Sequence, residues 1–130
     1  MQEKKGFTLL EIMIVGAFVS LLVVMFFIQK ANVDAMNRDD DRRTAINAMH
    51  YALQEYYYPK YGYYPLEISE EVLPVIDPAL FTDPLGINLG NDGSSYSYEP
   101  ANCNSENQCR EYILRAQLEK EEAYIKTGKQ

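Results

Sequence analysis

An apolar segment near the N-terminus, residues 7–28, constrains the fold of this chain more than any other feature. It holds 22 residues and a single charge, Glu11. At about 1.5 Å rise per residue, a helix of this length crosses a hydrocarbon core roughly 30 Å thick. A carboxylate in such a segment costs roughly 2.5 kcal/mol or more at mid-bilayer, and less near the interface. The sequence therefore predicts a membrane helix in which Glu11 needs a neutralising partner. The nearest candidate is the α-amino group that a cut between Gly6 and Phe7 would create.

The residues around the segment indicate its orientation. Lys4 and Lys5 precede it, so the positive-inside bias keeps the N-terminus in the cytoplasm and places the chain after Ile28 outside. An ordinary secretory signal fits poorly, because the short leader comes before the apolar run and no Ala-x-Ala site follows it. An uncleaved single-span anchor is the alternative.

A six-residue motif stands at the start of the apolar segment: Gly6-Phe7-Thr8-Leu9-Leu10-Glu11. It resembles the processing site of type IV prepilins and the related pseudopilins of type II secretion. The resemblance implies that a prepilin peptidase removes leader residues 1–6 and that the new N-terminus, Phe7, is N-methylated. It also implies that Glu11 pairs with the N-terminal amine of a neighbouring subunit in a filament.

Three functions follow as expectations. The first is a structural pilin subunit that is anchored in the membrane, contacts lipids and the inner-membrane assembly platform, and then polymerises with other pilin subunits into a type IV pilus on the cell surface. The second is a pseudopilin of a type II secretion system. The third is a membrane-tethered binding module that does not polymerise. An uncut leader and an inert Glu11 would indicate the third.

The segment Asp83-Pro84-Leu85-Gly86 resembles a turn of major pseudopilins, with Leu85 in place of an aromatic residue. In those proteins calcium can rigidify the loop downstream. Asp83 and Asp92 are therefore calcium candidates here, because carboxylate oxygens suit that ion. Further oxygens could come from Asp77, Asn88 and Glu99. These residues form no ordered ligand ladder, and plain turn chemistry explains Asn91-Asp92-Gly93 equally well. We expect no other metal and no cofactor.

The two cysteines, Cys103 and Cys109, predict a disulfide, because an even count in an extracytoplasmic chain favours a bridge. Closing so short a loop gains on the order of 2–3 kcal/mol at best. A metal site fits poorly, since the only histidine, His50, lies far away in the sequence. No catalytic motif is present, so we expect no enzyme activity. The net charge of −7 also disfavours general nucleic-acid binding, which needs Lys and Arg.

The remaining pattern predicts an α+β fold. The transmembrane helix, residues 7–29, continues as an amphipathic helix over residues 30–58 and ends near Tyr58, because Pro59 follows. Its buried face is expected to consist of Met36, Ile46, Met49, Leu53 and either Tyr56 or Tyr57. The charged run 39–43 is expected to face solvent, with i,i+4 pairs between Arg38 and Asp34 and between Arg43 and Asp39.

Residues 59–130 are expected to form a small globular domain. Seven of the eleven tyrosines lie between Tyr51 and Tyr64, and they either wrap the helix end or form an exposed aromatic stripe for a partner. A long connection follows, with one short helix over residues 70–75. Period-two patterns then predict an antiparallel sheet of about three strands, whose apolar residues Tyr112, Leu114, Ala116 and Leu118 pack against the long helix.

Overall fold

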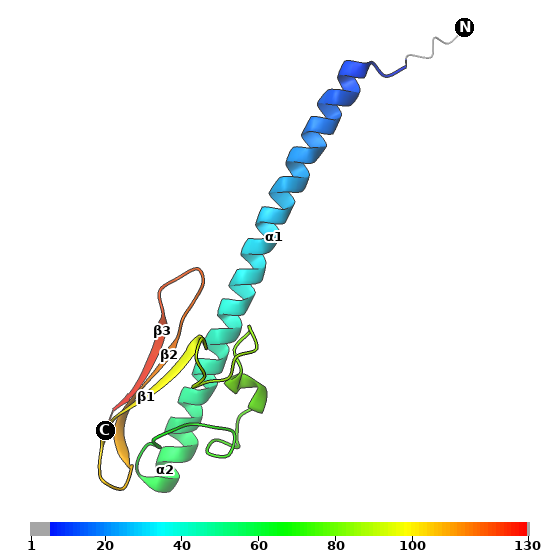
Figure 1. The fold of residues 1–130 in the computed structure, drawn as a ribbon. Helices are drawn as coiled ribbons and strands as arrows, with labels where there is room; N and C mark the ends of the chain where they lie inside the picture. Colours follow the sequence, from blue (N-terminus) through cyan, green and yellow to red (C-terminus); the bar gives the residue numbers. More distant parts are fainter. Residues whose placement is uncertain (1–5, 130) are drawn as a thin grey trace. The chain divides into compact units, whose positions relative to one another are not determined.

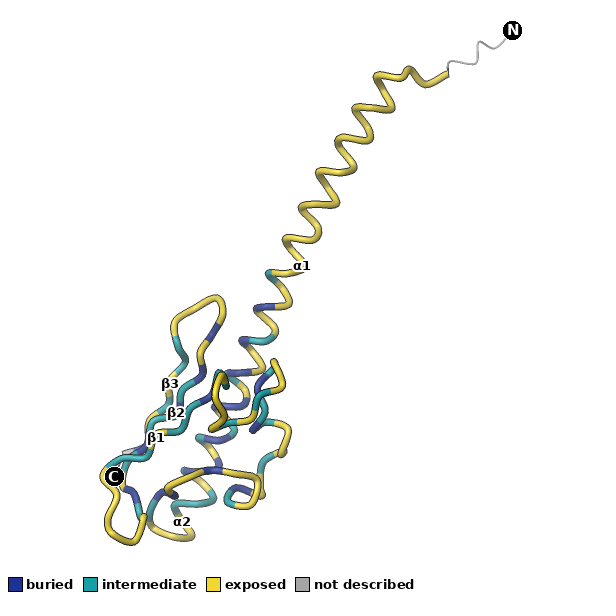
Figure 2. The backbone as a smooth tube through the Cα atoms, in the orientation of Figure 1, coloured by how far each residue is buried: buried dark blue, intermediate teal, exposed yellow. Residues whose placement is uncertain are grey.

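The computed structural model describes residues 6–129, and their contacts divide them into two compact units that meet between Ala35 and Met36. In the first unit, helix α1 (Leu9–Tyr51) begins and carries the apolar segment (Figure 1). Every residue from Gly6 to Ala31 is exposed, as Figure 2 shows. By length and composition, this helix is apolar enough to cross a membrane.

The second unit contains the rest of α1 and two further helical segments that continue it. These are a π-helical segment, η1 (Ala52–Tyr57), and a short helix, α2 (Tyr58–Tyr61). The expected helix end near Tyr58 is wrong, because the chain stays helical past Pro59. In η1 the Tyr58 N–H bonds to the Leu53 carbonyl, an i→i−5 bond that widens the turn just before the proline. Gly62, with φ of 77°, ends the helix in the left-handed conformation.

The predicted antiparallel sheet is confirmed, and the described residues form three strands in the order β1-β2-β3. Their bounds are β1 (Tyr96–Cys103), β2 (Cys109–Ala116) and β3 (Tyr124–Lys129). Tyr112 of β2 lies opposite Pro100 on one side and Gly128 on the other. A turn with bends at residues 119–122 connects β2 to β3.

The core lies between the sheet and the helix of the second unit (Figure 1). The predicted face of β2 is buried at every position, and the helix covers it with Ile46, Met49 and Leu53. These three side chains lie at helical spacing and are fully buried, so the amphipathic prediction is confirmed. Met36, expected on the same face, is exposed. The fold class is therefore α+β, with one long helix packed on a three-stranded sheet.

The connection between helix and sheet holds one short helix in a different place from that expected. Residues 70–75 form hydrogen-bonded turns, in which Leu73 N–H bonds to the Ser69 carbonyl at 2.9 Å, and Pro74 follows at once. The helix expected there is therefore wrong. A 3-10 helix, η2 (Pro78–Phe81), forms instead. Asp77 caps it by accepting a hydrogen bond from Ala79 N–H, and Pro78 suits the first helical position.

Candidate functional site

The N-terminal motif places a helix start directly after the expected cleavage position. The Thr8 hydroxyl oxygen accepts a hydrogen bond from Glu11 N–H at 3.2 Å, and the Thr8 carbonyl accepts one from Ile12 N–H at 3.2 Å. Thr8 is thus the N-cap, and Thr-x-x-Glu has the spacing of a capping box. Glu11 lies in the first turn, where unpaired N–H groups and the helix dipole favour a negative charge. This capping signal was readable in the sequence and was missed.

The Gly6–Phe7 bond lies in non-helical backbone before α1, and the Phe7 side chain is exposed. The rest of the predicted leader, including Lys4 and Lys5, lies outside the described residues. Beyond the motif, α1 runs through Gly16 and Ser20 without a break, and the Ser20 hydroxyl donates to the Gly16 carbonyl at 2.6 Å. The segment therefore presents an uninterrupted apolar surface whose backbone and hydroxyl groups are satisfied internally, as a hydrocarbon environment requires.

The charged run 39–43 does not face solvent throughout, which corrects the expectation. Asp40 and Asp41 are exposed, but Asp39 and Arg42 are buried. The Arg42 guanidinium bonds to Asp39 at 2.8 Å and to Glu119, in the β2–β3 turn, at 2.9 Å. Asp39 in turn accepts backbone N–H bonds from Glu119 and Lys120. This cluster, Asp39, Arg42 and Glu119, ties the helix to the turn.

Two neighbouring arginines, Arg38 and Arg43, also pair across the fold. Arg38 makes two hydrogen bonds to the Glu119 carboxylate, at 2.7 and 2.6 Å. Arg43 pairs with Glu121 at 2.6 Å. Both arginines thus pair with a turn about eighty residues away in sequence, and no local pattern could have signalled these pairs.

The charges in the cluster keep the carboxylates ionised. Burial raises the pKa of Asp39, but the Glu119 and Lys120 N–H groups and Arg42 outweigh it, so the pKa lies below its ordinary value. Hydrogen bonds from Arg38 and Arg42 lower the pKa of Glu119 to about 2. The buried Arg42 therefore faces two carboxylates that remain charged at neutral pH.

Asp83, a calcium candidate, organises the loop before β1 through hydrogen bonds. One carboxylate oxygen accepts from Leu85 and Ile87 N–H, and the other accepts from the N–H and hydroxyl of Ser95. Burial alone would raise the pKa of Asp83, but these bonds lower it. Ser95 also accepts from Arg42 Nε at 3.1 Å, so the loop joins the cluster.

Three of the other calcium candidates lie in separate local structures. Asp92 is exposed in a turn, Asp77 caps η2, and Asn88 accepts a hydrogen bond from Thr82 at 2.6 Å. Within residues 6–129, no group of three or more His, Cys, Asp or Glu side chains is arranged to hold a metal ion. Asp83 thus acts on the protein's own N–H and hydroxyl groups.

The predicted disulfide joins Cys103 and Cys109 at the end of the β1–β2 ladder. Inside the loop, the Asn104 side chain accepts hydrogen bonds from Glu106 and Gln108 N–H, both at 3.0 Å. Cys109 also exchanges two backbone hydrogen bonds with Tyr64, at 2.8 and 3.0 Å. The loop is therefore held against the segment that follows the long helix.

The tyrosines divide into an inner, buried group and an outer, exposed group. Tyr64 and Tyr112 are buried with ring centroids 4.6 Å apart, and Gln54 donates to both hydroxyls. The Tyr112 hydroxyl and His50 Nδ1 share a hydrogen bond of 2.7 Å, which gives the single histidine a structural role. Tyr51 and Tyr61 remain largely exposed. The outer rings are thus available to a partner.

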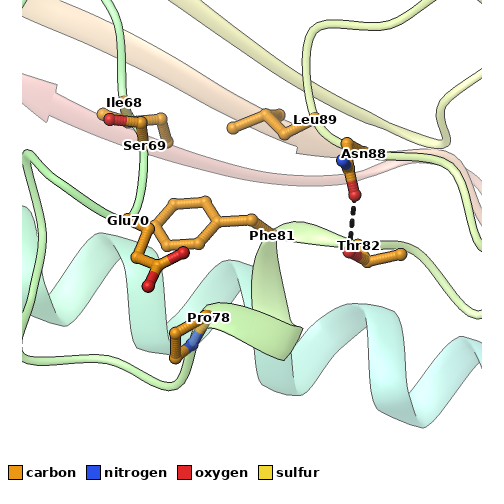
Figure 3. Close-up of a pocket in the computed structure, with 8 residues that line it drawn as sticks. All are labelled: Ile68, Ser69, Glu70, Pro78, Phe81, Thr82, Asn88 and Leu89. Carbon is orange, nitrogen blue, oxygen red and sulfur yellow. Dashed lines mark hydrogen bonds between the residues drawn. The ribbon is translucent and has the colours of Figure 1, made fainter.

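Figure 3 shows a pocket of about 340 Å³ in the connection between helix and sheet. The Phe81 ring extends toward Ile68 and Glu70, and Thr82 bonds to Asn88 on the opposite side. The lining contains one carboxylate and no histidine, cysteine or lysine. Its polar side chains are those of Ser69, Glu70, Thr82 and Asn88.

Comparisons with protein-family models, with curated proteins and with solved structures found no match. Any functional conclusion therefore depends on the chain's own residues and on their arrangement. Two features stand out: the capped start of α1 directly after Gly6–Phe7, and the uncovered apolar surface that follows it.

Proposed function

We propose that this chain is a pilin, a structural subunit that polymerises into a type IV pilus after cleavage between Gly6 and Phe7. One observation carries the proposal: the Gly-Phe-Thr-Leu-Leu-Glu motif coincides with the capped start of one continuous helix, whose apolar surface is bare. An apolar surface of this length requires lipid or other apolar helices around it. A membrane before assembly and a helical bundle afterwards supply these two environments.

The helix start supports a specific role for Glu11. In the bilayer, the unpaired N–H groups of the first turn and the positive end of the dipole offset part of its charge. Cleavage adds an amine at Phe7, one residue before the N-cap. In a filament, the amine of a neighbouring chain would pair with Glu11. An unpaired carboxylate in that dry bundle would cost several kcal/mol, so the pair sets the register of assembly.

The second unit has features of an extracytoplasmic domain. The Cys103–Cys109 disulfide suits an oxidising compartment, and the net charge of −7 favours solubility on the cell surface. We therefore propose a membrane-anchored precursor with its C-terminal domain outside, processed by the prepilin peptidase and delivered to the filament by the inner-membrane assembly platform. In the filament, this chain polymerises with other pilin subunits of the same kind as a homopolymer.

One observation favours a second candidate, a pseudopilin of a type II secretion system. The turn that begins with Asp83-Pro84 is organised by the Asp83 carboxylate, which bonds to Leu85 and Ile87 N–H. Such a turn resembles the one noted above for major pseudopilins. Pilin and pseudopilin share the processing step and the role of Glu11, and they differ in whether the assembled fibre reaches the cell surface.

Filament yield in Glu11 variants tests the proposal. We expect Glu11→Gln and Glu11→Leu to remain in the membrane at the wild-type level and to give no filaments in the sheared surface fraction. Ser20→Ala is a matched control, because the Ser20 hydroxyl bonds only within its own helix. It should polymerise normally. Wild-type filament yield from either Glu11 variant would refute the assembly role of the carboxylate.

A further inference from the structure

A second pocket, of about 320 Å³, lies where the end of the long helix meets the disulfide loop. One side comes from the segment around Gly62, and the other from the ends of β1 and β2. The lining residues are Tyr61, Gly62, Tyr63, Asn102, Asn104, Gln108 and Arg110. Two aromatic rings, three amides and one guanidinium thus converge on a space within the range of small-ligand sites.

The charge of this pocket is opposite to that of the whole chain. Its lining contains Arg110 and no carboxylate, whereas the pocket of Figure 3 contains Glu70 and a neighbouring one contains Glu67. Arg110 is exposed and makes no hydrogen bond or ion pair with any described residue. The Lys60 ammonium lies 4.9 Å from the centroid of the Tyr61 ring and adds a second positive charge beside the pocket. In a chain of net charge −7, this pocket suits an anionic group.

Of the three side-chain amides that line the pocket, one forms hydrogen bonds within the loop, and the other two have groups that remain available to a ligand. Asn104 is fully engaged inside the loop, where its side chain also donates to Gln108 Oε1 at 3.0 Å. The amide nitrogen of Gln108 and the side chain of Asn102 make no hydrogen bond with the described residues. The disulfide and the Tyr64–Cys109 bonds fix the loop backbone that carries these side chains, so the backbone does not need to order when a ligand binds.

We propose that this pocket binds an acidic saccharide, a sugar that carries a carboxylate. The Arg110 guanidinium takes the carboxylate in a charge-assisted contact. The Asn102 and Gln108 amides meet sugar hydroxyls, since an amide offers both a donor and an acceptor. The Tyr61 and Tyr63 rings supply the apolar wall against which the C–H groups of the sugar pack. The inference does not depend on polymerisation, since one chain contributes every lining residue.

Binding of trigalacturonic acid to the full-length protein in detergent micelles tests the proposal. The chain has no tryptophan, so titration can be followed by tyrosine fluorescence and checked by calorimetry. We expect the acidic trisaccharide to bind and neutral maltotriose to bind at least about tenfold more weakly, because a charge-assisted contact is absent. Arg110→Gln should remove the same factor of about ten.

The matched control is Arg115→Gln, a substitution in the same strand at a residue outside the pocket lining. It should leave binding unchanged, and near-ultraviolet circular dichroism of both variants checks that the tyrosine environments are intact. Absence of trigalacturonate binding, or an equal loss in both arginine variants, would overturn the proposal. Equal affinity for maltotriose would overturn the role of the carboxylate. Equal affinity for a tripeptide with a free C-terminus would overturn the assignment to a sugar.

Discussion

Arg42 should be the most sensitive single position in the second unit. Its side chain is 2% exposed and bonds to Asp39, Glu119 and Ser95, which belong to the helix, the β2–β3 turn and the start of β1. Methionine would keep the aliphatic stem and remove the charge and the donors. Asp39 would then remain buried without the cation that bonds to its carboxylate.

Breaking a buried ion pair from one side costs about 3–5 kcal/mol. The lower end applies here, because Asp39 keeps its backbone N–H bonds from Glu119 and Lys120, and Glu119 is partly exposed. We therefore expect Arg42→Met to lower the free energy of unfolding by about 3 kcal/mol, a large fraction of the 5–15 kcal/mol typical of a whole domain.

Urea unfolding of the full-length protein in micelles, followed by the near-ultraviolet dichroism of its tyrosines, measures this loss. Arg43→Met is the matched control, since Arg43 pairs with the largely exposed Glu121, and it should change the midpoint little. Added salt should shift the wild-type midpoint little, because the Arg42 pair is buried. A loss of less than about 1 kcal/mol in Arg42→Met, or a loss no larger than that in Arg43→Met, would refute the reasoning.

Three further outcomes follow from the second unit. Burial, followed by the charge of Lys126, lowers the pKa of His50 below 6.5, so below that pH the unfolded chain binds more protons. The urea concentration at the unfolding midpoint of the wild type should therefore decrease as the pH is lowered from about 7 to about 5.5. The midpoint of His50→Gln should not change over this range. A Cβ at Gly128 would overlap the Tyr112 ring, so Gly128→Ala should cost about 1–3 kcal/mol while Thr127→Ala in the same strand costs little. Removing both cysteines, as Cys103→Ser with Cys109→Ser, should cost about 2 kcal/mol for so short a loop, and an unchanged midpoint would show that the hydrogen bonds alone hold it.

The parts of the fold that follow from local periodicity were predictable. The buried face of β2 and the stripe of Ile46, Met49 and Leu53 each repeat at the spacing of their element. The apolar segment was predictable from its length and composition. The cysteine pair was predictable because an even number of cysteines in a chain expected outside the cytoplasm favours a bridge. In the site, the motif at Gly6–Phe7 and the position of Glu11 were visible at once, whereas the capping bond from Thr8 was overlooked.

The parts that depend on distant partners were not predictable. The sequence pattern predicts that Arg42 lies on the surface, because it belongs to a charged run. Its partner Glu119 lies 77 positions further along the chain. Pro59 predicts a helix end near Tyr58, because no local sequence signal indicates the π-helical turn that accommodates the proline. The Arg110 pocket likewise combines residues from the helix end and from two strands, which only the folded sheet brings together.

The intact mass of the chain in filaments sheared from the cell surface tests the central claim most directly. The account predicts a polypeptide that begins at Phe7, carries one added methyl group and is two hydrogens lighter because of the Cys103–Cys109 bond. A processed chain absent from the sheared fraction but present in the membrane would instead favour the pseudopilin. A chain that retains Met1 and is found only in membranes would contradict the account and would indicate a tethered, non-polymerising protein.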